Sequence, residues 1–283
     1  MIGALLLRVG NRRYPFRMLW LRRVVDKVWP PRWLYQTYER QVLGSIDRAS
    51  LPRHVAVLAD GNRRWARLNA PGQPLEVGYR AGADKLRQFV EWCDQAEIQV
   101  VTLWVLSTDN LDRSSEEELA PLLHVIEQLV TELVSTRRWN VQAVGALDLL
   151  PEDTATCLRT AASSTDDVKG MHVNVAVSYG GRHELRDAVR SLLAERAEHG
   201  DSLREVARTV EITEIAEHLY TRGQPDPDLI IRTSGEQRLS GFLMWQSAHS
   251  EFYFCEALWP DFRKVDFVRA LRSYAQRERR FGR

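Results

Sequence analysis

The stretch HVAVLADGNRRWA, residues 54–66, decides the fold. Residues 55–59 form a short apolar run between Pro52 and an Asp-Gly pair, a pattern typical of a strand that is buried on both faces of a sheet. Asp60 follows directly, and open α/β sheets bind their ligands at the carboxyl ends of the strands. Gly61 allows a tight turn there. We therefore expect a ligand site where this strand ends.

The residues after the turn favour a phosphate group as the ligand. A helix that opens here would present free N–H groups, which attract phosphate. Arg63 and Arg64 add two guanidinium groups that match phosphate oxygens. One carboxylate beside such a turn indicates a metal ion that bridges the protein to a diphosphate. An isolated Asp-Gly pair is more often only a turn, so the prediction depends on the other strand ends.

Apolar runs and helical periodicity alternate along the rest of the chain, which predicts an α/β domain with parallel crossovers and a central, mostly parallel sheet flanked by helices. The strands are expected at residues 55–59, 100–106, 141–144, 173–177, 229–231 and 251–254. The helices are expected around residues 86–93, at 116–138, 152–164, 182–196 and 201–220, and in the basic tail.

Residues 1–50 are interpreted as a basic amphipathic helical appendage, and residues 51–283 as the main domain. The appendage has helical spacing at residues 15–29 and 32–48, separated by two prolines. Residues 1–53 contain eleven basic and three acidic residues, a net charge of +8, whereas the whole chain has +1. A basic leading segment suggests contact with anionic headgroups, and a solvated helical face is an equal alternative. The near-neutral total argues against a nucleic-acid partner.

Composition also indicates the compartment. We expect neither a transmembrane helix nor a signal peptide, because no apolar run is long enough and the first residues lack a cleavage site. Cys93, Cys157 and Cys255 form neither a metal spacing nor a disulfide framework. A cytoplasmic protein is therefore expected, with peripheral contact at the inner face of the cell membrane if the appendage binds lipid.

Further polar clusters follow the other strands. One is STDN, residues 107–110, and another is SYGGR, residues 178–182. The segment RTSGEQRLS, residues 232–240, has two arginines around a glycine turn with hydroxyls nearby, which suits a second diphosphate; a surface salt-bridge loop is the alternative. The chain has neither a P-loop nor a dinucleotide-binding glycine motif, so those nucleotide folds are not expected.

These motifs together resemble the cis-prenyltransferases, the undecaprenyl diphosphate synthase family, and most closely the short-chain Z-farnesyl diphosphate synthases of actinobacteria. The resemblance covers residues 53–283. Besides the stretches already quoted, it rests on GYRAG (residues 78–82), NVAV (174–177), DLII (228–231), WQSAHSE (245–251) and WPDF (259–262).

The resemblance implies a homodimeric, magnesium-dependent enzyme with a hydrophobic tunnel, which condenses isopentenyl diphosphate onto an allylic diphosphate. It implies catalytic roles for Asp60, which would also hold magnesium, and for Asn110, which is associated with proton removal. It implies substrate contacts for Gly61, Asn62, Arg63, Arg64, Trp65, Ser107, Asp109 and Arg113 and, at the isopentenyl diphosphate, for Arg232, Arg238 and Ser240. Glu251 would be a second magnesium ligand.

The chain also departs from the family pattern. Many members have glycine where Arg63 stands, Tyr79 replaces a histidine, and Leu75 stands near an expected arginine. Long-chain members have a small residue just before the serine of the second strand, whereas Trp104, Val105 and Leu106 precede Ser107 here. We therefore expect a short product of farnesyl size, with geranyl diphosphate as the allylic substrate. A medium- or long-chain product, a non-catalytic partner subunit and a phosphate-binding regulator are the alternatives.

Overall fold

The computed structural model describes residues 39, 41, 44, 46–113 and 116–277. Contacts divide the chain into two units, Met1–Ser45 and Ile46–Arg283, and the elements below all belong to the second. The helices predicted for the basic appendage fall largely outside the described residues and stay predictions. In the part of the chain that the structure describes, no helix is both long and apolar enough to cross a membrane.

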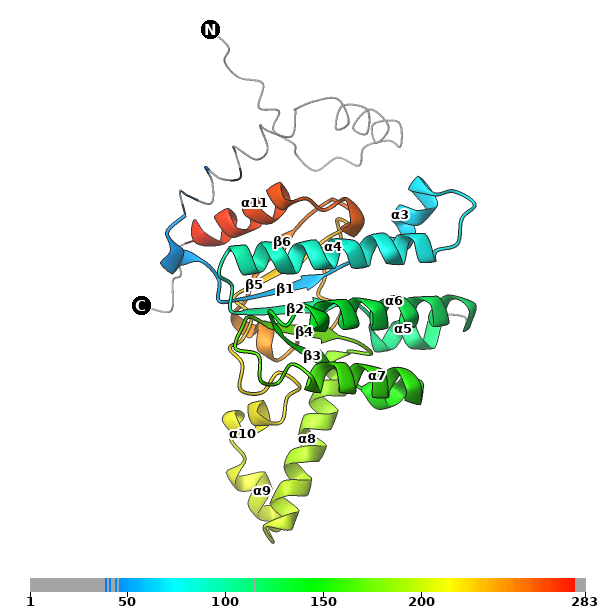
Figure 1. The fold of residues 1–283 in the computed structure, drawn as a ribbon. Coiled ribbons are helices and arrows are strands. Elements are labelled where there is room, and N and C mark those ends of the chain that lie inside the picture. The colour runs from blue at the N-terminus through cyan, green and yellow to red at the C-terminus, as the bar shows by residue number, and fades with distance from the viewer. Residues whose placement is uncertain (1–38, 40, 42–43, 45, 114–115, 278–283) are drawn as a thin grey trace. The chain divides into compact units, whose positions relative to one another are not determined.

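Six strands form one sheet in the order β3-β4-β2-β1-β5-β6, and every neighbouring pair is parallel (Figure 1). The strands are β1 (His54–Leu58), β2 (Val100–Trp104), β3 (Asn140–Val144), β4 (His172–Ala176), β5 (Leu229–Arg232) and β6 (Glu251–Phe254). All five residues of β1 are buried, as the apolar run predicted. The predicted α/β architecture is confirmed, with a sheet that is parallel throughout.

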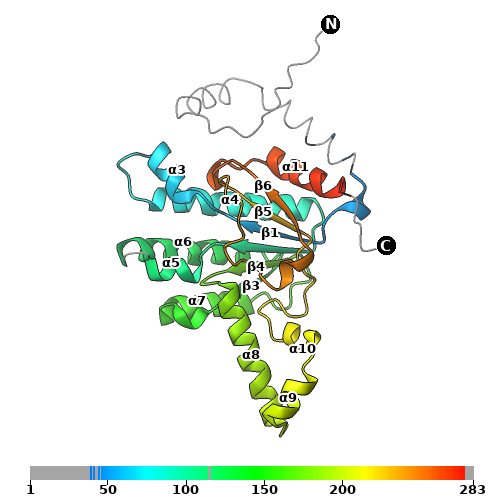
Figure 2. The ribbon, with the colours of Figure 1, turned by 180° about the vertical axis from the view of Figure 1, so that it is seen from behind.

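The helices cover the sheet and extend beyond it. They are α3 (Asn62–Asn69), α4 (Glu76–Gln95), α5 (Thr108–Arg113), α6 (Glu116–Ser135), α7 (Glu152–Ser163), α8 (Gly181–Glu198), α9 (Leu203–Thr209), α10 (Ile212–Glu217) and α11 (Lys264–Ala275). Helices α4, α6 and α7 pack side by side along the sheet, whereas α8 and α9 project away from it (Figures 1 and 2).

The prediction of a single helix at residues 201–220 is wrong, because α9 and α10 are separate helices. Each begins with its own capping box, Ser202 with Glu205 and Glu211 with Glu214. A capping box satisfies the free N–H groups of a helix start, so it stabilises a new beginning at residue 211. The backbone of Val210 is extended between the two helices.

A row of buried polar side chains crosses one face of the sheet. The His54 imidazole has Nε2 2.8 Å from the Thr102 hydroxyl, which also accepts a bond from Asn174 at 3.0 Å. Nδ1 of His54 lies 2.7 Å from the carbonyl oxygen of Pro225, which can only accept, so Nδ1 has the proton. Asn174 in turn bonds Gln224 at 2.6 Å. The row thereby ties the segment before β5 to the sheet.

Stability is expected to depend on the protonation of His54. Burial lowers its pKa from 6.5 to about 4, so the unfolded chain binds the proton first. Neutral His54 therefore contributes about 3 kcal/mol to the free energy of unfolding. This contribution is complete above about pH 6.5 and is lost as the pH falls towards 4. Urea unfolding of the wild type and of His54→Gln between pH 7 and 4 measures it. Parallel pH profiles for the two proteins would contradict this assignment.

Candidate active site

The turn after β1 is held in a conformation that favours glycine. Gly61 has φ +116°, and a Cβ there would lie 3.0 Å from Cδ2 of Leu258. α3 begins at the next residue, so its first N–H groups point out from the strand end. The phosphate-binding turn expected at this position therefore has the required backbone, a helix start directly behind a strand.

Two glycines of α4 hold Asn62 at the start of α3. A Cβ on Gly78 would lie 2.4 Å from the Asn62 carbonyl oxygen, and one on Gly82 would lie 2.5 Å from its side-chain oxygen. Any larger residue would push α4 away from the turn. The two glycines of the GYRAG motif thus allow the close approach of two helices.

Asp60 is fixed through its backbone and leaves its carboxylate facing outward. Its N–H donates to the Thr233 hydroxyl at 3.1 Å, and that hydroxyl donates to the Asp60 carbonyl at 2.8 Å. The carboxylate oxygen Oδ2 accepts a bond from Nη2 of Arg232 at 3.2 Å. The Asp60 side chain is 40% exposed and that of Arg232 only 5%. A buried arginine therefore orients a carboxylate whose remaining surface is open.

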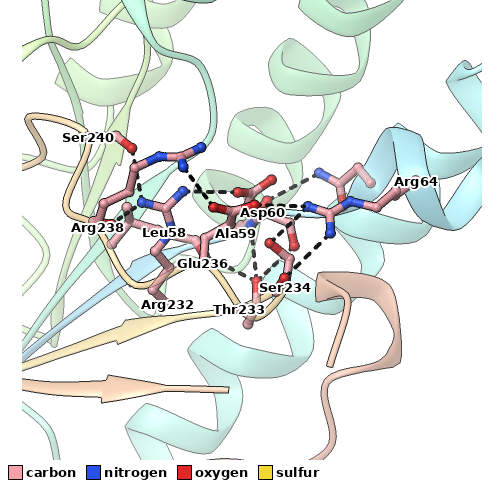
Figure 3. A network of polar contacts seen from close by, with 11 residues as sticks. Leu58, Ala59, Asp60, Arg64, Arg232, Thr233, Ser234, Glu236, Arg238 and Ser240 are labelled. Atoms are coloured by element: carbon pink, nitrogen blue, oxygen red, sulfur yellow. Dashed lines mark hydrogen bonds and ion pairs between the residues drawn. The ribbon is translucent and has the colours of Figure 1, made fainter. Parts of the chain in front are cut away.

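Arg232 joins the two predicted diphosphate segments. Its Nη1 donates to the Ser240 hydroxyl at 2.9 Å and to the carbonyl oxygen of Arg238 (Figure 3). The guanidinium fork therefore holds the 238–240 turn on one side and Asp60 on the other. Its Nε is buried and has no hydrogen-bond partner among the described residues. Arg232 is buried and so does not belong to a surface salt-bridge loop, whereas Arg238 is 68% exposed and forms an ion pair with Glu236.

Glu236 lies between two of the predicted phosphate-binding arginines, and sequence reasoning did not single it out. Its carboxylate is 2.8 Å from Nη1 of Arg238 and 3.9 Å from Nη2 of Arg64 (Figure 3). Arg64 also bonds the Ser234 hydroxyl at 3.3 Å. One carboxylate thus holds side chains from both segments in position beside Asp60.

Arg63 comes close to α4 and α6. Its Nη1 lies 3.5 Å from a carboxylate oxygen of Glu118 on α6. The pKa of the Tyr79 hydroxyl, on α4, is above its usual value, mainly because the side chain is buried. The charge of Glu118 adds to this increase and the charge of Arg63 partly offsets it. The Tyr79 hydroxyl therefore stays protonated, and the additional charge at residue 63 is balanced by a carboxylate of α6.

The polar cluster after β2 forms the opposite wall. Ser107 bridges to Tyr179 after β4, and its hydroxyl accepts a bond from the Asn110 N–H at 3.1 Å. This bond starts the short helix α5, on which Asp109 and Asn110 lie. Two strand ends that are about 70 residues apart in sequence thereby become one surface.

A cavity of about 980 Å³ lies at these strand ends. Eight of the predicted site residues line it: Asp60, Arg63, Ser107, Asp109, Asn110, Arg232, Arg238 and Ser240. Arg182 and His183, at the start of α8, line it too. Four arginines face two aspartates there, a charge balance that suits a diphosphate. Trp104, Val105 and Leu106 line the same cavity and give it an apolar wall.

Arg182 and His183 extend the predicted site. The sequence placed the motif that contains Arg182 at a strand end, but it assigned neither side chain to the site. The signal that could have found them is the double glycine before them, since Gly181 packs against the loop that contains Ser240: its N–H donates to the Gly241 carbonyl at 2.9 Å.

The other predicted residues lie outside this lining. Gly61, Asn62 and Arg64 belong to the turn and helix behind it. The Trp65 indole donates to Asp261 at 2.8 Å and anchors α3. The side chain of Arg113, at the end of α5, is not among those that the structure describes.

Glu251 lies at the amino ends of the parallel strands, whereas Asp60 lies at their carboxyl ends. Glu251 is the first residue of β6, whereas Asp60 lies two residues after the end of β1, and all neighbouring strands are parallel. The two residues are therefore separated by the length of a strand, and Glu251 pairs with Arg277 instead. The structure does not bring the two expected metal ligands together within one chain. A shared ion would need a second chain.

The residues of the cavity fit a magnesium ion held mainly by substrate. Among the described residues, no group of three or more His, Cys, Asp or Glu side chains could hold a metal. Asp60 offers one open carboxylate next to the arginines. Magnesium is commonly bound through one or two carboxylates together with phosphate oxygens and water. The donor set therefore suits an ion that arrives with a diphosphate.

Comparisons with known proteins identify the family of the chain. The prenyltransferase family model, which describes undecaprenyl diphosphate synthases, matches residues 58–282. The (2Z,6E)-farnesyl diphosphate synthase of Thermobifida fusca is 59% identical over 88% of this chain and 97% of its own. A short-chain Z-isoprenyl diphosphate synthase of Mycobacterium bovis is 52% identical over 90% of this chain and 98% of its own.

A solved structure shows the same fold. The lavandulyl diphosphate synthase of Lavandula x intermedia, in complex with dimethylallyl diphosphate, superimposes with a TM-score of 0.75 and 35% identity. The match covers 83% of this chain and all of that one. The family resemblance of the motifs is thus confirmed over the whole domain. The chain belongs to the undecaprenyl diphosphate synthase family of cis-prenyltransferases.

Proposed function

We propose that this chain condenses isopentenyl diphosphate with an allylic diphosphate, geranyl diphosphate foremost, to give a cis-prenyl diphosphate of farnesyl size. The observation that carries the proposal is the contact between Asp60 and buried Arg232, which joins the turn after β1 to residues 238–240. Two basic segments meet at one carboxylate, as two diphosphates and one ion require.

The residues divide into two binding groups. The α3 start, with Gly61, Asn62, Arg63 and Arg64, receives the allylic diphosphate. Arg232, Arg238 and Ser240 hold isopentenyl diphosphate. Asp60 lies between them and would hold magnesium, which would neutralise the charge of the departing diphosphate.

The second wall of the cavity serves the proton that leaves isopentenyl diphosphate. Ser107 fixes the start of α5 and so directs Asn110 into the cavity beside Asp109. There the Asn110 amide would assist the removal of that proton. The apolar wall is where the expected tunnel begins, and Val105 and Leu106 limit its length.

Product analysis tests this function. Purified protein with magnesium, labelled isopentenyl diphosphate and one of dimethylallyl, geranyl or farnesyl diphosphate is expected to give one dominant Z-farnesyl product from geranyl diphosphate. Relatives named for farnesyl or short-chain products support this expectation. A dominant product of undecaprenyl length would overturn the short-chain assignment. No transfer with any primer would favour a non-catalytic partner subunit.

Two further proposals concern partners. A homodimer is supported by β6, an edge strand on which Phe254 is 40% exposed, and equilibrium sedimentation tests it. Contact of residues 1–50 with a membrane at the inner face of the cell is supported by their basic composition. Co-sedimentation of the full chain with anionic and with neutral liposomes tests it, and equal binding to both would refute a charge-driven contact.

A further inference from the structure

Three side chains form a row at the ends of neighbouring strands, below the cavity. Leu58 on β1 is the register partner of both Trp104 on β2 and Arg232 on β5, so all three lie on one face of the sheet. All three side chains line the cavity. Strands are about 4.8 Å apart, which places the Cα atom of Trp104 about 10 Å from that of Arg232.

Trp104 is held rigidly by other aromatic rings. Its indole stacks on the Phe242 ring with centroids 4.9 Å apart and planes 5° apart. Tyr179 meets both rings edge-on, at 6.3 Å and 5.7 Å. Phe242 and Tyr179 are completely buried, whereas Trp104 is partly exposed. The exposed part of the indole therefore faces the cavity, at a fixed position.

One ring of the aromatic stack, Phe242, lies in the same segment as the residues proposed to hold isopentenyl diphosphate. Phe242 follows Ser240 by two residues, and Ser240 accepts the bond from Arg232. A diphosphate held by Arg232 and Ser240 therefore has the stack as its apolar neighbour. With its diphosphate on Arg232 and Ser240, an isopentenyl chain of about 5 Å would lie over Leu58, between Arg232 and the indole.

We propose that Trp104 is the contact for the isopentenyl group and determines the specificity for this substrate. The inference rests on the proposed function and deepens it. It gives Trp104 a different role from the product-length limit expected from the bulk of residues 104–106, because the indole packs with the isopentenyl segment.

The chemistry of the step explains why an aromatic ring suits this position. The allylic C–O bond breaks and its electron pair leaves with the diphosphate. The isopentenyl double bond supplies the electron pair for the new C–C bond, which leaves positive charge on the neighbouring tertiary carbon. A proton then passes from the adjacent carbon to the released diphosphate, and a new double bond forms. The face of an indole attracts such a cation, whereas an aliphatic side chain of similar size does not.

Steady-state kinetics of Trp104→Leu and Trp104→Phe test the proposal. Trp104→Leu is expected to lower kcat/KM for isopentenyl diphosphate about ten-fold, as loss of a cation–π contact would. Its KM for geranyl diphosphate should stay within two-fold. Trp104→Phe retains a ring and should recover most of the loss. Circular dichroism checks that each variant is folded.

Trp92→Leu is the matched control, because Trp92 is also partly exposed and packed among aromatic rings, on α4 away from the cavity lining. It should lower the melting temperature without changing kcat/KM for isopentenyl diphosphate. Unchanged kinetics in Trp104→Leu, or longer products with an unchanged kcat/KM, would overturn the inference and leave the proposed function intact. Absence of prenyl transfer in the wild type would overturn the function itself.

Discussion

Replacing Asp60 with alanine is expected to lower kcat about a thousand-fold or more, equivalent to about 4 kcal/mol of barrier. Asp60 is the carboxylate where the two basic segments meet, and its side chain remains 40% exposed to the cavity. The substitution removes the carboxylate that we propose as the magnesium ligand beside the leaving diphosphate. That charge develops only as the reaction proceeds, so kcat should fall more than substrate affinity. Product formation over a magnesium titration measures the loss.

Asp60→Asn separates the metal role from the structural role. The amide can still accept a bond from Arg232, which alanine cannot, but it is a poor magnesium ligand. We expect Asp60→Asn to be nearly as inactive as Asp60→Ala and closer to the wild type in unfolding free energy, since a buried arginine without its partner destabilises the fold.

Asp94→Ala is the control for Asp60. Asp94, in the last turn of α4, is 34% exposed and pairs with Arg138, and neither residue lines the cavity. Its kcat should stay within two-fold of the wild type. Full activity in Asp60→Ala would show that the central role assigned to this carboxylate is wrong.

The strand ends could be predicted because each strand is a short apolar run whose end is marked by polar or glycine residues. β1, β2 and β4 therefore appeared in the sequence almost at their observed bounds, and parallel strands bring such ends to one edge. Asp60 and Arg232 are 172 residues apart, yet both were identified from local patterns. Their pairing at 3.2 Å follows from the parallel register of β1 and β5.

Features that depend on which side chains meet in space were not predictable. Glu236 has no local pattern that distinguishes it from an ordinary loop carboxylate, and only the fold places it between Arg64 and Arg238. The position of Glu251 at the start of its strand rather than at its end was visible in the sequence. Its consequence, separation from Asp60, required the sheet order.

Arg232→Lys is expected to lower kcat/KM for isopentenyl diphosphate about 100-fold, or about 2.7 kcal/mol. The Arg232 guanidinium contacts Asp60 through one nitrogen and Ser240 through the other. A lysine ammonium is a single point charge and cannot hold both groups while it also meets a phosphate. Loss of one or two charge-assisted hydrogen bonds explains an effect of this size. Initial rates at varied isopentenyl diphosphate measure it.

The same substitution elsewhere provides the control. Arg196 bridges Asp201 and Glu214 and is 28% exposed, away from the cavity lining. Arg196→Lys should lower the melting temperature and leave both KM values unchanged. Because Arg232→Lys keeps the buried positive charge, the fold should survive and the defect should appear in kinetics. If the KM for the allylic diphosphate rises while that for isopentenyl diphosphate stays constant, the two diphosphate groups are assigned to the wrong substrates. The Asp60 contact alone would then explain the role of Arg232.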